Sequence, residues 1–337
     1  MSTHLLRCLL LFILFTSCAT ISRNPEQEPA RHQSSLNFSE PVSSDFNDVD
    51  TSAISKEQFD HDIIPLPLTD LPRNQDGAFV LSPGLYEADF KTYCLQPGTP
   101  GPSSNDAYFQ AELKGNRKEI IQTILRNSTT HPNLEQKNIQ LLLWSVVSRS
   151  NFNSLSWPVQ STARQLLSPK QVFDLQGGML GVAKTMVKML PSTGASNEIK
   201  QVFETGVSSY DAIERLAVLS TPSRITNSDF KREQWLKKED GYYVRYLPSN
   251  YSNTKIQVYV PAGIGDSTAI ARNDYTLFDP ASSVVVPAYS NAQRLGVGGP
   301  IIDIVRVVIQ TVGKNPAPPK PKPPVYKGGK PVPVKTS

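Results

Sequence analysis

The two ends of this 337-residue chain have compositions that cannot form a packed core, and they confine the fold to the middle. Residues 19–76 carry eleven acidic and four basic side chains, a net charge of −7, and no sustained apolar period. Residues 314–337 contain six lysines, no acidic residue and a run rich in alternating proline and lysine. Because such segments bury too little apolar surface to offset the entropy of ordering, we expect both to be disordered. We therefore predict one folded domain over residues 76–312 and a basic, proline-rich tail over 313–337.

The first 18 residues indicate export. Arg7 precedes an apolar run, Leu9–Phe15, which is too short to span a bilayer and which Thr16, Ser17 and Cys18 follow. This pattern predicts a signal peptide over residues 1–17. Small residues before a cysteine resemble the lipobox of bacterial lipoproteins, which implies a mature chain lipidated at Cys18, carrying fatty acyl groups such as palmitate. The protein would then sit on the cell membrane or outer membrane, with residues 18–75 as an acidic tether; an ordinary signal peptide that contains a cysteine is the alternative.

Patterning in the middle predicts a mixed α+β domain, with a helical middle region packed against short N-terminal strands and a C-terminal antiparallel hairpin. The expected strands are 84–90, 92–95 and 283–287, and the hairpin joins 242–247 to 256–260. The segment 301–312 is a strand or a short helix. Helices are predicted over 118–127, from a capping box at Asn133 and Gln136 to about 149, after Ser156, after Ser168, over 179–190 and over 198–219.

Cysteine usage singles out one thiol. Cys8 leaves with the signal peptide and Cys18 is blocked by the predicted lipid, so Cys94 is the one thiol left in the exported chain. Exported proteins meet oxidising conditions, and a lone cysteine has no internal disulfide partner. Cys94 is therefore buried and inert, paired with another molecule, or committed to other chemistry.

Two short motifs favour the third alternative, in which Cys94 takes part in a chemical reaction. Tyr93-Cys94-Leu95 is followed, after a helical segment, by Ile139-Gln140-Leu141-Leu142-Leu143-Trp144. Over about residues 86–149 this pair resembles the thioester domains of bacterial surface adhesins, in which a strand cysteine and a helix glutamine condense to an internal thioester. The resemblance implies a bond between Cys94 and Gln140 that a lysine amine of a partner protein opens.

Physical chemistry sets what such a bond needs. Fixed contact between thiol and amide replaces many kcal/mol of entropic cost, and the product survives only where water is excluded. Tyr93 flanks Cys94 directly, and Trp144 lies four residues after Gln140 on the same helical stripe, so we predict that both shield the bond. The alternative interpretation is an inert, buried Cys94 and a structural Gln140.

Other function classes are less favoured. The near-neutral middle has no electrostatic footprint for nucleic acid, and no cluster has metal-ligand spacing, so neither a metal nor a cofactor is predicted. A cysteine hydrolase would need a Cys94–His131 dyad, because the other histidines lie outside the predicted domain. A non-catalytic envelope scaffold stays open; in it the Pro-Lys tail contacts cell-wall polymer or serves as a stiff spacer. A role other than catalysis is favoured over an enzyme.

Overall fold

We describe the fold from a computed structural model, over residues 41–59, 63–177, 194–206, 209–264 and 275–301. Helices and strands both contribute, which confirms the mixed α+β class. The predicted signal peptide, Cys18, the segment 179–190 and the proline-rich tail lie outside the described residues. No helix within the described ranges is both long and apolar enough to cross a bilayer.

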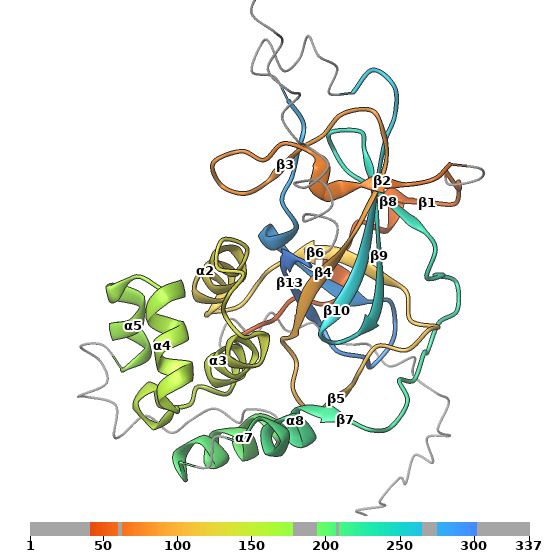
Figure 1. Cartoon of the computed structure of the whole chain (residues 1–337). Coiled ribbons are helices and arrows are strands. Elements are labelled where there is room, and N and C mark those ends of the chain that lie inside the picture. The colour runs from red at the N-terminus through yellow and green to blue at the C-terminus, as the bar shows by residue number, and fades with distance from the viewer. Residues whose placement is uncertain (1–40, 60–62, 178–193, 207–208, 265–274, 302–337) are drawn as a thin grey trace, which may run out of the picture. The chain divides into compact units, whose positions relative to one another are not determined.

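Six antiparallel strands close into a barrel, a feature that the sequence patterns did not predict (Figure 1). Pairing of Tyr108 with Tyr246, which lie in β6 and β9, completes the ring. Further short strands extend the sheet: β1 and β8 continue from β9, and β2 runs parallel to the start of β4. In ring order the barrel strands are β4 (Gly84–Cys94), β10 (Asn253–Val260), β9 (Tyr243–Asn250), β6 (Tyr108–Glu112), β12 (Ser283–Pro287) and β13 (Leu295–Pro300).

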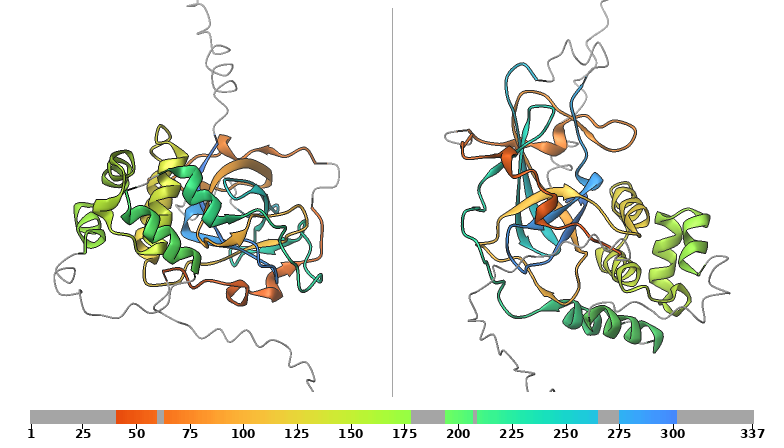
Figure 2. Two further views of the ribbon diagram at one scale, coloured as in Figure 1. Left: turned by 90° about the horizontal axis from the view of Figure 1, so that it is seen from below. Right: turned by 180° about the vertical axis from the view of Figure 1, so that it is seen from behind.

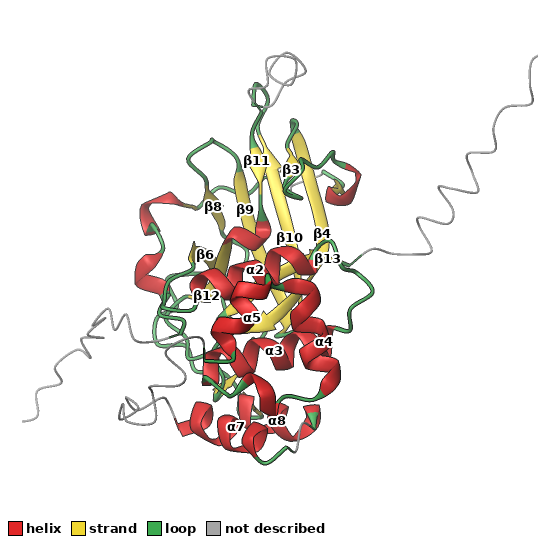
Figure 3. Ribbon diagram, turned by 90° about the vertical axis from the view of Figure 1, so that its left-hand side faces the viewer, coloured by secondary structure: helices red, strands yellow, loops and turns green. Residues whose placement is uncertain are grey.

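The helices gather on one side of the barrel, in two layers (Figures 1 and 3). The first two helices of the chain order pack on β13 and β4. The next two lie outside that pair, and the last two lie near one end of the barrel (Figure 2). One continuous apolar core fills the barrel and the space beneath the inner helices. In chain order the helices are α2 (Lys118–Ser128), α3 (Gln136–Ser148), α4 (Trp157–Leu166), α5 (Pro169–Leu175), α7 (Gly194–Glu204) and α8 (Tyr210–Ala217).

Local signals place several of these elements as predicted. The Ser168 hydroxyl accepts the Gln171 N–H, and the Gln171 side chain accepts the Ser168 N–H. They form a complete capping box, with Pro169 at the first helical position. The hairpin of β9 and β10 pairs Gln257 with Arg245, and only Tyr251 and Ser252 separate its strands. Predicted strands 84–90 and 92–95 are one continuous β4.

Two local predictions are wrong. The capping box at Asn133 does not form: α3 begins at Gln136 after Glu135, without a side-chain cap, because the Gln136 side chain is used in a contact with β4. The single helix expected over 198–219 is two helices, α7 and α8, and Val218–Leu219 forms strand β7, which pairs in parallel with β5 (Thr99–Pro100).

The largest correction concerns the tether predicted for residues 18–75. From residue 41 onward the described part of this segment is ordered: it forms two short 3-10 turns, strand β1 (Ile54–Ser55), strand β2 (Leu66–Pro67) and a third turn at Leu68–Asp70. Four of its apolar side chains are buried in the hydrophobic core, although the segment has no sustained apolar period. They are Val42, Phe46, Val49 and Leu68.

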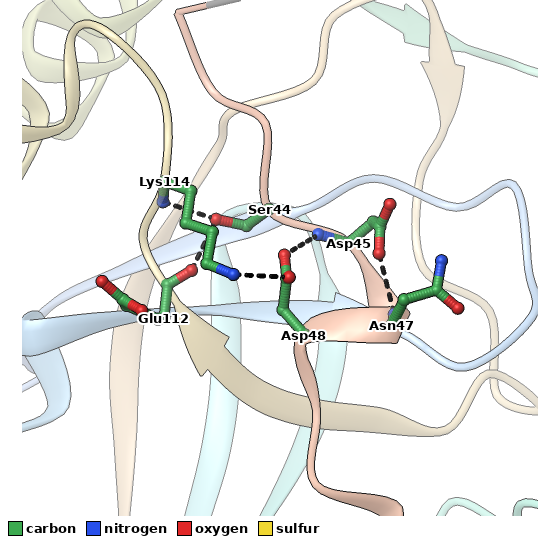
Figure 4. A network of polar contacts seen from close by, with 6 residues as sticks. All are labelled: Ser44, Asp45, Asn47, Asp48, Glu112 and Lys114. Carbon is green, nitrogen blue, oxygen red and sulfur yellow. Dashed lines mark hydrogen bonds and ion pairs between the residues drawn. The ribbon is translucent and has the colours of Figure 1, made fainter. Parts of the chain in front are cut away.

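Polar contacts fix this N-terminal segment to β6 (Figure 4). The Ser44 hydroxyl donates to the Glu112 carbonyl and accepts the Lys114 N–H at 2.7 Å. The Lys114 ammonium pairs with Asp48 at 2.7 Å, and Asp48 in turn accepts the Asp45 N–H at 2.9 Å. The folded domain therefore includes described residues before 76, from 41 onward.

The remaining short strands lie outside the barrel ring. Strand β3 (Phe79–Val80) pairs with β11 (Leu277–Phe278) in a separate two-stranded sheet. Strand β8 (Trp235–Lys237) pairs with β1 and β9.

A substitution in the N-terminal segment tests this boundary. Phe46 is buried and its ring lies 5.9 Å from Phe109 and 5.0 Å from Phe230, so Phe46→Ala should lower the free energy of unfolding by about 3 kcal/mol. The neighbouring Asn47 is exposed, and Asn47→Ala should change it by no more than about 0.5 kcal/mol. Urea unfolding measures both; equal stability of the two variants would mean that the segment does not belong to the folded domain.

Candidate functional site

Cys94 lies where one edge of β4 loses its strand partner. Strand β10 pairs with β4 from Gly84 to Lys91, and the hairpin then turns away. Strand β13 accompanies the other edge as far as the pairing of Cys94 with Leu295. The main-chain groups of Cys94 that face the β10 side therefore need a partner that is not a strand.

The carboxamide of Gln140 is that partner. Its Oε1 accepts the Cys94 N–H at 2.8 Å, and its Nε2 donates to the Cys94 carbonyl at 3.0 Å. One helical turn earlier, Gln136 Nε2 donates to the Thr92 carbonyl at 3.1 Å and to the Ser252 carbonyl at 2.7 Å. Helix α3 thus continues the ladder that β10 leaves, and the predicted proximity of Cys94 and Gln140 holds in the fold.

The surroundings of this pair exclude water. Cys94 and Trp144 have no exposed surface, and Gln140 is 1% exposed. The indole N–H of Trp144 is buried without a hydrogen-bond partner and lies near enough to the Cys94 sulfur to affect the pKa of the thiol. Burial raises the pKa of the Cys94 thiol to about 12, a rise that the Trp144 contact and the Gln96 backbone partly offset. The thiol is therefore neutral at physiological pH.

Tyr93 does not cover the thiol. Neighbouring residues of a strand point to opposite faces, and the Tyr93 ring packs over Gly298, where an added Cβ would lie 2.7 Å from the ring. Its hydroxyl lies beside Ser128 at the end of α2, and burial raises its pKa well above the usual value. Of the two predicted shields, Trp144 alone stands on the side of the thiol.

Two tyrosines that the sequence patterns did not indicate complete the cover. The ring of Tyr210, at the start of α8, lies 5.7 Å from the Trp144 ring, and that of Tyr251, in the β9–β10 turn, lies 6.4 Å from it. Both are distant from Trp144 in sequence, so only the docking of α8 and the hairpin against α3 brings them here. No spacing in the chain carries a signal for this contact.

The other candidate chemistries find no support in the described residues. His131 lies at the end of α2, where its Nδ1 contacts the Asn127 carbonyl at 2.9 Å and the Thr130 hydroxyl at 3.1 Å. These local contacts and the high pKa of the Cys94 thiol leave no activated Cys94–His131 dyad. Within the described ranges no group of histidine, cysteine and carboxylate side chains could hold a metal ion.

Comparison of the chain with protein-family models, with curated proteins and with solved structures gave no match. The fold and the site define the chain as a closed antiparallel barrel with a helical cover, in which a helix glutamine is held against a strand cysteine.

The pairing itself can be tested through stability. Gln140→Leu leaves the buried N–H and C=O of Cys94 without partners, so the free energy of unfolding should fall by about 2 kcal/mol or more. Gln165 lies on the exposed face of α4, and Gln165→Leu should change it by no more than about 0.5 kcal/mol. Unfolding in urea, followed by tryptophan fluorescence, compares the two; a neutral Gln140→Leu would contradict the structural pairing.

Proposed function

We propose that this protein attaches covalently to amine groups of a partner through an internal thioester between Cys94 and Gln140. The observation that carries the proposal is the Gln140 carboxamide held against Cys94 by two hydrogen bonds in a dry site. We propose further that an export signal and a lipid on Cys18 place the protein on the cell envelope, where a partner surface is within reach.

The hydrogen bonds favour formation of the bond. When the Cys94 sulfur attacks the carboxamide carbon, negative charge develops on Oε1, and the Cys94 N–H already donates to that atom. The carbon–nitrogen bond then breaks, and the nitrogen leaves as ammonia with the proton of the thiol. The contact fixed by the fold replaces the entropic cost of bringing the two groups together.

The same contacts favour an amine as the group that opens the bond. Loss of Nε2 removes the donor to the buried Cys94 carbonyl, and an unpaired buried carbonyl costs about 1–3 kcal/mol. An amine restores an N–H at this position, because its nitrogen takes the place of Nε2 in the new amide. Water or an alcohol brings no N–H, so the site favours a primary amine such as a lysine side chain.

Burial then governs the lifetime of the thioester. Trp144, with Tyr210 and Tyr251 packed against it, separates the site from bulk water and slows hydrolysis. The raised pKa of Cys94 makes the thiolate a poor leaving group until it receives a proton. An attacking amine carries a proton that can pass to the sulfur as the carbon–sulfur bond breaks.

Intact-mass spectrometry of the purified full chain tests bond formation. Wild-type protein should weigh one ammonia less than calculated, and Cys94→Ala should have its full calculated mass. Gln140→Leu should also lose the deficit, while Gln165→Leu keeps it. Any lipid on Cys18 changes all four proteins alike, so the readout is the difference between variants. A full calculated mass for fresh wild-type protein would reject the thioester.

Thiol labelling tests the opening reaction. Wild-type protein unfolded directly into maleimide should leave Cys94 unlabelled, because its sulfur is held in the thioester. After incubation of the folded protein with methylamine, the chain should gain the mass of one methylamine and the Cys94 peptide should label fully. Full labelling without methylamine would contradict the proposal, and labelling of the folded protein that falls in His131→Ala would favour a cysteine hydrolase.

A further inference from the structure

Three polar side chains form a hydrogen-bonded chain at the surface beside the cover of the site. The hydroxyl groups of Tyr210 and Tyr251 lie 2.6 Å apart, and the Tyr251 hydroxyl donates to Oε1 of Glu214. Tyr210 and Glu214 stand one turn apart on α8, and Tyr251 comes from the β9–β10 turn. All three side chains are partly exposed, so they link solvent with the buried Trp144.

The number of hydroxyl protons fixes which group donates in each of these hydrogen bonds. Tyr251 has one hydroxyl proton, which it gives to the Glu214 carboxylate. Tyr251 can therefore only accept from Tyr210, so Tyr210 is the donor in the 2.6 Å contact. The Tyr210 oxygen keeps its lone pairs and has no proton left to give elsewhere, which makes it an acceptor for an incoming N–H.

This surface already attracts an ammonium group. The Nζ atom of Lys137 lies over the Tyr210 ring, 4.9 Å from its centroid. A cation in this position is stabilised by the negative face of the ring. Burial raises the pKa of Tyr210 to about 12, so at neutral pH this residue passes a proton on rather than acting as the base.

We propose that Tyr210, Tyr251 and Glu214, here called the proton relay, receive the partner's ammonium group and take up the proton that it must lose before attack. This inference rests on the proposed thioester. It identifies the substrate class as a protonated primary amine that can reach the Tyr210 ring, and it assigns the proton acceptor that the Cys94–Gln140 pair does not itself supply.

The proton balance closes through the relay. The ammonium gives one proton to the Tyr210 oxygen as the Tyr210 proton moves to Tyr251 and the Tyr251 proton moves to Glu214, which becomes a neutral acid. The free amine attacks the carbonyl carbon of Gln140, the carbon–sulfur bond breaks, and the second proton passes from nitrogen to the Cys94 sulfur. The products are the amide and the Cys94 thiol, and Glu214 returns its proton to solvent.

Reaction rates with two amines of different charge distinguish proton transfer by the relay from a purely structural role of these residues. At neutral pH methylamine is a cation, whereas hydroxylamine is already neutral and needs no base. We would measure the rate of mass gain of thioester-bearing full-length wild type, Glu214→Gln and Tyr210→Phe with each amine. The control is Asp211→Asn, which removes a charge from an exposed position of the same helix.

Glu214→Gln and Tyr210→Phe should slow the methylamine reaction about 10- to 100-fold and leave the hydroxylamine reaction within about twofold of wild type. Asp211→Asn should react like wild type with both amines, and Glu214→Asp should recover part of the lost rate. Unchanged methylamine rates, or equal slowing with both amines, would overturn the relay while the wild-type mass deficit still upheld the thioester. A wild type without the deficit would instead reject the proposed function.

Discussion

The structure depends on one pair of hydrogen bonds to the main chain of β4. Where strand β10 turns away from β4, the side chain of Gln140 makes the hydrogen bonds that a strand would make. The carboxamide has the same donor and acceptor as a peptide group, so it satisfies the N–H and C=O of Cys94 as a strand residue would. Gln136 donates to the Thr92 carbonyl, whereas the Thr92 N–H still donates to Ser252 in the hairpin turn. These two residues, four apart on α3, fix the helix to the end of the barrel and place the Gln140 carboxamide against the main chain of Cys94.

Burial of Cys94 and Gln140 has two opposed effects on the chemistry of the site. It raises the pKa of Cys94 to about 12, which removes the thiolate that a cysteine hydrolase would use. It also excludes the water that would hydrolyse a thioester. A buried cysteine with a neutral thiol, whose main chain holds a carboxamide in place, suits a bond that forms once and waits for a partner better than it suits repeated turnover.

Local patterns in the sequence were sufficient where a local signal sets the structure. The apolar face of α2, the start of α5 at Ser168 and Pro169, and the β9–β10 hairpin each depend on neighbouring residues, and all three form. The pairing of Cys94 with Gln140 was accessible through a motif pair. The sequence patterns failed where distant segments meet: closure of the barrel at Tyr108 and Tyr246, and the burial of Phe46.

The candidate site also combines residues that local sequence patterns indicated with residues that only the tertiary fold brings together. Helical spacing placed Trp144 next to Gln140, but adjacency in sequence misplaced Tyr93, because successive strand residues face opposite ways. The relay residues Tyr210, Tyr251 and Glu214 come together only through the docking of α8 on the hairpin turn.

A crystal structure of freshly purified protein would show directly whether the thioester forms. We predict continuous electron density from the Cys94 sulfur to the Gln140 side-chain carbon, with no density for Nε2; separate side chains with an intact carboxamide would contradict the thioester.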